Sequence, residues 1–438
     1  MDIKKICDNE IYSNKNIPIS ISKDILNFAE SGFKEIETSK KVLELFKSLG
    51  QKKIDTEIAL TGLKTTLDTG REGPNIAVIG ELDGLPVPGH PYENKENSYA
   101  HACGHHAQIG SIFTVFMGLS NKKILNNLCG KITFMAVPAE EFVEIEWRNK
   151  LREDGHIEFL AGKQEMIKDG HFDDIDMAMM THTTPRNLKF SYGGTNNGLV
   201  AKFIEFIGKA SHAGNSPEKG INALNAANIA MNAINSQRET FKDEDHIRVH
   251  PIITKGGNVV SAVPDIVKIE TFVRGASIES IMDANEKVDN CLKAGALATG
   301  CKLKIVTIPG YLPIKNNQEL QNLYISNLKN NYNEKDIVLD NHSGGSTDMG
   351  DVSNLIPSIH PYVGGCKGSS NHANDMVVEN YDLSVIESGR MMAHTIIDLL
   401  GNNAKNAKKI KDQFDPSFDR KSYLSFLRGI SKEEEFKF

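Results

Sequence analysis

The stretch NIAVIGEL, residues 75–82, decides the fold that the sequence predicts. It is short and apolar along nearly its whole length, which is typical of a strand that is buried on both faces of a sheet. KITFMAVP (131–138) and DIDMAMMTH (174–182) have the same character, and helical stretches such as IGSIFTVFMGLS (109–120) lie between such runs. This alternation of strands and helices indicates an α/β domain.

Acidic or histidine side chains follow each of these three runs. Asp83 stands just after the first run, Glu140 and Glu141 come shortly after the second, and His182 ends the third. Functional groups in open α/β sheets gather at the carboxyl ends of the strands. We therefore expect these four side chains on one side of the sheet.

From residue 198 onward the sequence predicts a second, smaller domain. Its elements follow the order β-α-β-β-α-β, which is that of a ferredoxin-like unit. The first of its helices begins with Ser216 as the N-cap and Pro217 in the first turn. The predicted strands are 198–210, 246–254, 266–275 and 301–308, and the predicted helices are 216–236 and 277–300.

After Pro309 the α/β pattern returns, so the smaller domain is inserted into the larger one. A chain of 438 residues is long for one hydrophobic core, which also favours two domains. We predict the larger domain at 1–195 and 311–438, with the insert at 196–310. Helical spacing across residues 22–50 predicts a helix that stops at Gly50, and the charged segment from Gly401 predicts a surface helix with a frayed end.

The composition excludes several classes of function. A net charge of −7 leaves no basic excess for a phosphate-binding face, so we expect no nucleic-acid partner. No run approaches the roughly 18 apolar residues of a membrane span, and the first ten residues lack the apolar core of a secretory leader. The 6 cysteines are scattered without a CxxC pair, which is typical of reduced thiols. We therefore expect a cytoplasmic protein without a membrane partner.

The loop SYAHACGHHAQIGS, residues 98–111, carries a cysteine and three histidines within six positions. Cys103 and His105 are two residues apart, so both side chains can face one point. Taken alone, a CxH pair usually does not bind a metal, and adjacent carboxylates such as Glu140 and Glu141 are often simply solvated. Taken alone, His182 and the His372 of NHAND would be ordinary core or loop histidines. Together they form a set of thiolate, imidazole and carboxylate groups, which suits zinc or a related divalent ion. A carboxylate beside a ligating carboxylate can also serve as a general base.

Nine motifs appear along the chain in this order: TGLKTTL, GELDGLP, HACGH, PAEE, GKASHAGNSPEKGINAL, VPD with a following arginine, PGYLP, GGSTDMGD and IHPYVGG. With these motifs the chain resembles the metallo-aminoacylase and carboxypeptidase family, and most closely its amidohydrolase branch, which includes p-aminobenzoyl-glutamate, auxin-conjugate and hippurate hydrolases. The resemblance implies a zinc-exopeptidase-like three-layer α/β/α catalytic domain with an inserted ferredoxin-like domain that acts as lid and dimerisation domain.

The resemblance also implies roles for individual residues. Two divalent ions, zinc or manganese, would be bound, with His105 between them. Glu140 would be the general base, and Asp83 would orient a neighbouring ligand. In a homodimer formed through the lid, His212 would stabilise the oxyanion at the partner subunit's site, and Arg274 would bind the carboxylate of the substrate. The implied metal ligands are Cys103, His105, Glu141, His182 and His372.

Two positions depart from the pattern of the branch. His106 follows the CGH triplet where many members have Asp or Asn, which leaves its role open. Ser261, in SAVP, replaces the asparagine of the usual Asn-x-x-Pro, and Asn258 stands three residues earlier as a candidate for substrate binding. Both departures bear on the choice of substrate more than on the metal ligands.

The resemblance therefore implies hydrolysis of an amide bond in an N-acyl or aminobenzoyl amino acid, or in a dipeptide with a free carboxylate. One alternative is a cysteine hydrolase in which Cys103 is the nucleophile, but it leaves the glutamate pair and His372 unused. Another is a metal-dependent binding or regulatory module without turnover, against which the intact Glu140 argues.

Overall fold

The computed structural model describes residues 2–438, which form two compact units. The first unit comprises the chain up to Thr195 together with Lys315–Asn341 and Asp351–Arg420. The second comprises Asn196–Ile314, His342–Gly350 and Lys421–Phe438.

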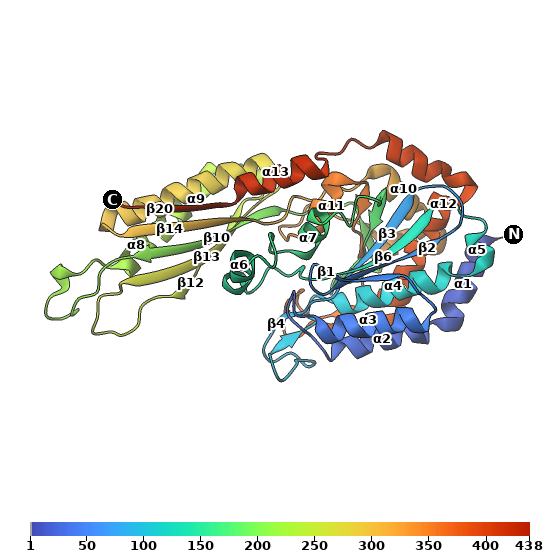
Figure 1. The fold of residues 1–438 in the computed structure, drawn as a ribbon, viewed down its shortest axis with the longest axis horizontal. Helices are drawn as coiled ribbons and strands as arrows, with labels where there is room; N and C mark the ends of the chain where they lie inside the picture. Colours follow the sequence, from blue (N-terminus) through green and yellow to red (C-terminus); the bar gives the residue numbers. More distant parts are fainter. Residues whose placement is uncertain (1) are drawn as a thin grey trace. The chain divides into compact units, whose positions relative to one another are not determined.

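A six-stranded sheet organises the first unit (Figure 1). Its central strand β3 (Asn75–Glu81) pairs in parallel with β6 (Lys131–Val137) and β7 (Met177–Met179), so their carboxyl ends lie at the same edge. Every residue of β3 is buried, because layers cover both faces of the sheet. The three predicted strands are therefore confirmed. The full order is β1 (Ile54–Ile58), β2 (Gly62–Asp68), β6, β3, β7 and β16 (Ser358–Ile359).

Helix α4 (His105–Leu119) packs against β3 and is buried over its whole length. It is surrounded by α1 (Ile3–Asn14), α2 (Asn16–Leu26) and α12 (Ser388–Gln413), the last of which has non-helical backbone at 401–404. Its first residue is a predicted ligand, so the core that fixes α4 also fixes the start of the candidate site.

The single helix predicted at 22–50 is wrong. Residues 16–26 form α2 and residues 36–48 form α3 (Ile36–Ser48), with an irregular segment between them. Phe33 in this segment has a positive φ of 66°, which interrupts a helix. A Cβ on Gly32 would lie 2.6 Å from the Cα of Ala139, so the segment packs closely on the end of β6.

The remaining elements of the first unit are short. Three of them, β8 (His182–Thr183), β9 (Phe190–Tyr192) and β17 (Tyr362–Val363), form a small sheet with β15 (Ile337–Leu339). The residue ranges of helices α11 (Met349–Leu355) and α13 (Arg420–Ile430) each include residues of both units. The others are β4 (Leu85–Pro86), β5 (Tyr99–Ala100), α5 (Lys122–Leu125), α6 (Ile145–Glu153), α7 (Gly162–Lys168), α10 (Gln318–Asn331), β18 (Cys366–Lys367) and β19 (Val377–Val378).

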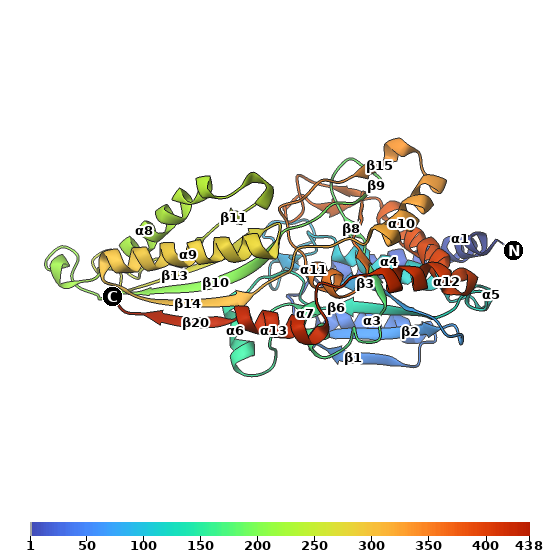
Figure 2. The ribbon, with the colours of Figure 1, turned by 90° about the horizontal axis from the view of Figure 1, so that it is seen from above.

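The second unit is an antiparallel sheet with two helices on one face (Figure 2). In β13, alternate residues such as Val267, Ile269 and Val273 are buried in the core that the helices share. The mixed α/β architecture with a β-α-β-β-α-β unit is therefore confirmed. The elements are β10 (Gly198–Ile207), α8 (Ala223–Ser236), β11 (Arg248–Val249), β12 (Ile252–Lys255), β13 (Ile266–Gly275), α9 (Ile278–Thr299), β14 (Lys302–Pro309) and β20 (Lys432–Phe436).

The helix predicted from Ser216 begins later than expected. Its N-cap is Asn222, whose side chain accepts hydrogen bonds from the backbone N–H groups of Leu224 and Asn225. Ser216 makes no capping bond and precedes only a short 3₁₀ turn. Ile221 exchanges backbone hydrogen bonds with Lys209, and this pairing prevents an earlier helical start.

The charged C-terminal segment does not end as a frayed surface helix. Strand β20 pairs with β14 and covers an edge of the sheet that would otherwise be open. Glu433 Oε1 lies 2.6 Å from Lys304 Nζ, so the charges of this strand are partly compensated. Residues 342–350 also belong to the second unit, which the domain boundaries predicted from sequence did not include. Among residues 2–438, no helix is long and apolar enough to cross a membrane.

Candidate metal centre

The turn into α4 brings Cys103 and His105 to one point. Gly104, between them, has a positive φ of 85°, and a Cβ at this position would lie 1.9 Å from Thr183 Oγ1. Only glycine fits both the backbone conformation and the available space. The pairing of β8 beside this turn then places His182 next to Cys103.

Cys103, His105 and His182 form the first group of potential ligands. Their ligand atoms lie within 4.8 Å of one another, and all three residues are buried. Nδ1 of His105 lies 2.8 Å from the carbonyl oxygen of Asp83, and Nδ1 of His182 lies 2.7 Å from that of Thr183. A carbonyl oxygen can only accept, so both Nδ1 atoms carry the proton and both Nε2 atoms remain free to bind a metal.

Cys103, Glu141 and His372 form the second group, within the same 4.8 Å limit. Nε2 of His372 lies 3.3 Å from Cys103 Sγ and 3.0 Å from Glu141 Oε1. His372 has a positive φ of 68°, and its backbone N–H bonds to the carbonyl oxygen of Ala102. The contact between His372 and Cys103 links the loop around residue 372 to the HACGH turn, which lies about 270 residues earlier in the sequence.

Cys103 is common to these two groups, and the position of His105 between two ions stays a prediction. A third group consists of Glu81, His105 and Glu140, so His105 joins the first group to this one. The predicted base Glu140 is buried, with its Oε2 at 3.9 Å from His105 Nε2. The polar side chains that follow β3, β6 and β7 thus converge, as the sequence pattern predicted.

Asp83 connects the two halves of this centre. Its Oδ2 accepts a hydrogen bond of 2.8 Å from the backbone N–H of Glu141, and its Oδ1 lies 3.3 Å from His105 Nδ1. The side chain is fully buried. One carboxylate therefore orients both an imidazole and the backbone of a carboxylate ligand.

The charges of the donor set strongly perturb one another. Burial alone would raise the pKa of the Cys103 thiol, but His182, His372 and His105 hold that pKa well below its ordinary value. The Glu141 carboxylate raises the pKa of His372 to about 12. Burial opposes protonation of His105, yet Glu81 and Cys103 raise its pKa well above the usual value. The buried thiolate and carboxylates thus favour the protonated, positively charged forms of His105 and His372.

The donor chemistry fits divalent metal ions. A thiolate, three imidazoles and a carboxylate are ligands that zinc and related ions accept. Nε2 of His105 and Oε1 of Glu141 are buried and make no regular hydrogen bond, although Nε2 of His105 lies 3.1 Å from Glu81 Oε2 and Oε1 of Glu141 lies 3.0 Å from His372 Nε2. Buried polar atoms are normally bonded, and a metal ion would satisfy both.

Sequence reasoning missed Glu81 and Lys163. Glu81 is fully buried at the end of β3, with Oε2 at 3.1 Å from His105 Nε2 and Oε1 at 2.6 Å from Lys163 Nζ. Lys163 lowers the pKa of Glu81 to about 2, against the effect of burial. Glu81 could have been found from its spacing, because a residue two positions before Asp83 in an extended chain lies on the same side. Lys163 has no such signal.

His106 belongs to none of the three groups. It is buried, its Nε2 lies 3.4 Å from Tyr381 Oη, and its ring lies 5.5 Å from that of His101. Burial lowers its pKa to about 3, so the imidazole is neutral. The third histidine of the HACGHH run is therefore a neighbour of the ligand groups.

The other predicted site residues lie in the second unit. Arg274 lies on β13, where its Nη1 donates a hydrogen bond of 2.7 Å to Ser346 Oγ in the GGST segment. Its guanidinium also stacks over the ring of Phe272 at 5.1 Å. Its partner across the strand pair β11–β13 is Arg248.

His212 and Ser261 are brought together by short backbone pairing. The N–H of Ala213 donates to the carbonyl oxygen of Ser261, and that of Val263 donates to the carbonyl oxygen of Ser211. Nδ1 of His212 accepts from the N–H groups of Gly214 and Asn215 at 3.2 and 3.0 Å. In the neutral ring the proton must then be on Nε2, which leaves an exposed hydrogen-bond donor. Asn258 is exposed in the loop that precedes Ser261.

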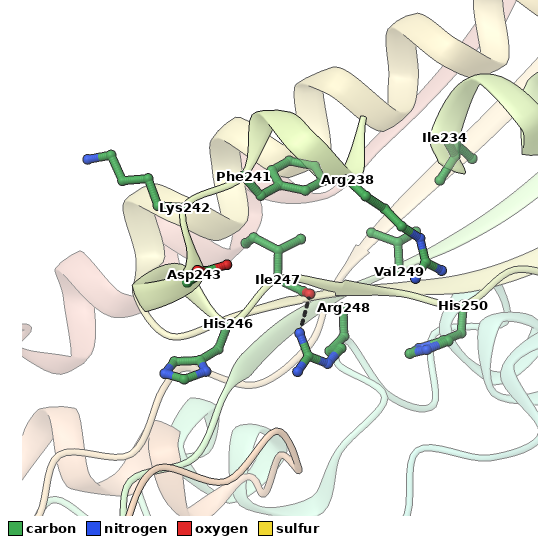
Figure 3. A pocket seen from close by; sticks show the side chains of 10 residues that line it. All are labelled: Ile234, Arg238, Phe241, Lys242, Asp243, His246, Ile247, Arg248, Val249 and His250. Atoms are coloured by element: carbon green, nitrogen blue, oxygen red, sulfur yellow. Dashed lines mark hydrogen bonds between the residues drawn. The ribbon is translucent and has the colours of Figure 1, made fainter. Parts of the chain in front are cut away.

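A cavity of about 470 Å³ also opens in the second unit, next to β11 (Figure 3). None of the predicted site residues lines it. Its cationic side chains include Arg238 and Arg248, and Arg248 Nη1 donates to the carbonyl oxygen of Ile247.

Comparison with known proteins gives a consistent result. The model of peptidase family M20/M25/M40 matches residues 77–398, which is more than half of the chain. The Xaa-Arg dipeptidase of Mus musculus is 28% identical over 76% of this chain and 71% of its own. One of the chains of p-aminobenzoyl-glutamate hydrolase from Escherichia coli (strain K12) is 31% identical over 50% of this chain and 49% of its own.

The fold has close counterparts among solved structures. A Bacillus subtilis protein described as a dinuclear metal-binding peptidase of the M20 family superposes with a TM-score of 0.65 at 19% identity. The match covers 87% of this chain and 97% of that protein. At this level of identity the likeness concerns the fold.

Proposed function

The chain belongs to peptidase family M20/M25/M40 and is a hydrolase of amide bonds, and we propose that it cleaves an N-acyl amino acid, an aminobenzoyl amino acid or a dipeptide with a free carboxylate. The observation that carries this proposal is the convergence of five donor side chains at the carboxyl ends of β3, β6 and β7, with Glu140 beside them. The family match alone does not specify the substrate.

We propose that the donor set holds two divalent ions, zinc or manganese. Cys103, His105, Glu141, His182 and His372 would hold these ions. Bound ions of this kind polarise the scissile carbonyl and make water more acidic. Asp83 keeps His105 and Glu141 oriented for binding.

Glu140 is the general base in this proposal. It is adjacent to Glu141 in sequence and buried at the same edge of the sheet, and it belongs to the group of Glu81 and His105 but to neither group that contains Cys103. A carboxylate placed in this way can take a proton from water and return it to the leaving amine. General acid–base catalysis of this type contributes about 10²- to 10⁴-fold to a rate.

Arg274 and His212 would act on the substrate. A guanidinium binds a carboxylate through two charge-assisted hydrogen bonds, and the neighbouring Arg248 adds positive charge on the same strand pair. The exposed Nε2–H of His212 is a donor suited to a developing oxyanion. We further propose that the protein is a homodimer in which His212 serves the partner subunit's site, with Ser261 and Asn258 contacting the same substrate.

A turnover panel tests the proposed function. The metal-loaded protein is incubated with acylated amino acids, aminobenzoyl-glutamate and dipeptides that end in arginine, the last two taken from the names of the relatives. We expect hydrolysis of at least one compound with a free carboxylate, and at least a 10²-fold lower rate for Glu140→Gln. Absence of turnover across the panel with two ions bound would contradict the proposal.

The same panel separates the cysteine hydrolase. If Cys103 were the nucleophile, verified metal-free protein would retain activity and thiol alkylation would abolish it in the metal-loaded state. The metal proposal predicts inactive metal-free protein and protection of Cys103 by the bound ions.

A further inference from the structure

Glu35 is a fully buried carboxylate at the start of α3. Its Oε1 accepts a hydrogen bond of 2.7 Å from the backbone N–H of Ala139, and its Oε2 accepts one of 2.6 Å from Thr61 Oγ1. Neither partner is a cation. Burial and the charge of Asp83 raise the pKa of Glu35 to about 8, and the hydrogen bonds from Thr61 and Ala139 favour the ionised form against both effects.

Ala139 is the residue immediately before Glu140 and has an unusual backbone. Its positive φ of 53° is in the left-handed region, which is unfavourable for a residue with a Cβ. Its N–H is bound by Glu35, and its carbonyl oxygen accepts from the N–H of Gly162 at 3.2 Å. Both polar groups of this residue are therefore fixed by other parts of the first unit.

Two carboxyl side chains thus accept hydrogen bonds from the backbone N–H groups of the residues on either side of Glu140. Glu35 holds the N–H of Ala139, and Asp83 holds the N–H of Glu141. Glu140 lies between these two anchors, so its Cα–Cβ direction depends on both. Removing the anchor at Glu141 would disturb a metal ligand, whereas removing the one at Ala139 would disturb mainly Glu140.

We propose that Glu35 is a positioning residue, which acts through the left-handed turn at Ala139 to aim the Glu140 carboxylate. This inference rests on the proposed role of Glu140 as the base. Without the Glu35 acceptor, Ala139 relaxes toward an ordinary negative φ, and the side chain that follows it rotates away from the ligand groups. A shift of about 1 Å in a catalytic group can lower a rate by about 10²-fold.

Three variants test this role. In Glu35→Ala the acceptor is lost, and kcat should fall by about 10- to 100-fold while KM and the bound metal stay unchanged. In Glu35→Gln the side-chain oxygen still accepts from Ala139, and the amide donates to the Thr61 hydroxyl, so kcat should stay within a few-fold of wild type. Thr61→Val is the matched control, because it removes the other hydrogen bond of the same carboxylate and should leave kcat unchanged.

The outcomes are distinct from failure of the proposed function. A folded, metal-loaded Glu35→Ala protein with wild-type kcat would overturn the inference, and so would equal kcat losses in Thr61→Val or in Glu35→Gln. If Glu35→Ala does not fold, Glu35→Asp withdraws the carboxylate by one methylene group and should give the same loss of kcat.

A crystal structure of the metal-loaded Glu35→Ala or Glu35→Asp variant gives a readout that requires no substrate. We expect Ala139 to leave the left-handed region and the Glu140 carboxylate to be displaced, while Glu141 keeps its hydrogen bond to Asp83. An unchanged Ala139 and Glu140 would overturn the positioning role even if the enzyme proved inactive on every compound tested.

Discussion

Asp83 Oδ2 accepts a hydrogen bond of 2.8 Å from the backbone N–H of Glu141, and through this bond the loop after β3 holds the residue that follows β6. The same aspartate lies 3.3 Å from the Nδ1 of His105. His105 belongs to the first ligand group and Glu141 to the second, and Cys103 is common to both groups. The orientation of His105 and of Glu141 therefore depends on Asp83, a buried carboxylate that belongs to neither group.

The first prediction concerns this carboxylate. Asp83→Asn keeps an acceptor for the N–H of Glu141 but removes the negative charge beside His105, so metal affinity should fall by about 10- to 100-fold. Competitive titration with a chelator measures the change. An affinity equal to that of wild type would show that the Asp83 carbonyl oxygen alone orients His105.

The second prediction separates the adjacent glutamates. Glu140→Gln should keep two bound ions while kcat falls by at least about 10²-fold, because the base is lost and the ligand is retained. Glu141→Gln removes a ligand charge beside Cys103 and His372 and should lower metal occupancy first. Elemental analysis measures the bound metal and steady-state kinetics measures kcat on the same samples. If Glu140→Gln lost metal and Glu141→Gln kept it with a low kcat, Glu141 would be the base and Glu140 the ligand.

The third prediction concerns removal of the metal. Exhaustive chelation should abolish hydrolysis, and manganese or zinc should restore it, because the thiolate, imidazole and carboxylate groups act by holding those ions. Cys103 should react with an alkylating reagent only in the metal-free protein, which peptide mass spectrometry can show.

The fourth prediction concerns Arg274. Arg274→Ala should raise KM for an acylated amino acid far more than for the corresponding amide, since only the acid forms a charge-assisted pair. Arg274→Lys should recover little of this loss, because an ammonium group does not reproduce the two parallel hydrogen bonds. Equal losses on acid and amide would show that the arginine has a structural role, such as its hydrogen bond to Ser346.

The fifth prediction concerns the proposed sharing of sites between subunits. Homodimers of His212→Asn and of Glu140→Gln should each be nearly inactive, because each lacks one required group at both sites. A mixed dimer has one site that lacks both groups and one that lacks neither, so co-refolding should restore up to about a quarter of wild-type activity. Absence of recovery in dimers whose mixing is verified by differential tags would place His212 in its own subunit's site or outside catalysis.

Much of the first unit could be predicted from local pattern. The apolar runs 75–82, 131–138 and 174–182 form β3, β6 and β7, because a short uninterrupted apolar run is stable in a strand that is buried on both faces. Parallel pairing then places their carboxyl ends at one edge. This is why the side chains that follow them could be grouped correctly from the sequence.

Local pattern failed where distant contacts set the backbone. Helical spacing continues through residues 22–50, but packing of Gly32 on Ala139 interrupts the helix. Ser216 and Pro217 have the features of a helical start, yet pairing of Ile221 with Lys209 delays the helix to Ala223. In both places a tertiary contact overrides the intrinsic preference of the segment.

By itself, the sequence determined the α/β class and the inserted β-α-β-β-α-β unit, because spacing along strands and turns is a local property, and its motifs supplied the family resemblance from which five donor residues are predicted. Only the tertiary structure decided which side chains lie close together, with Cys103 common to the group that contains His182 and the group that contains His372. It also brought Glu81 to Lys163 and Glu35 to Ala139, pairs that are 82 and 104 positions apart. Such pairings depend on how strands and helices pack across the core, and no spacing within a single segment encodes them.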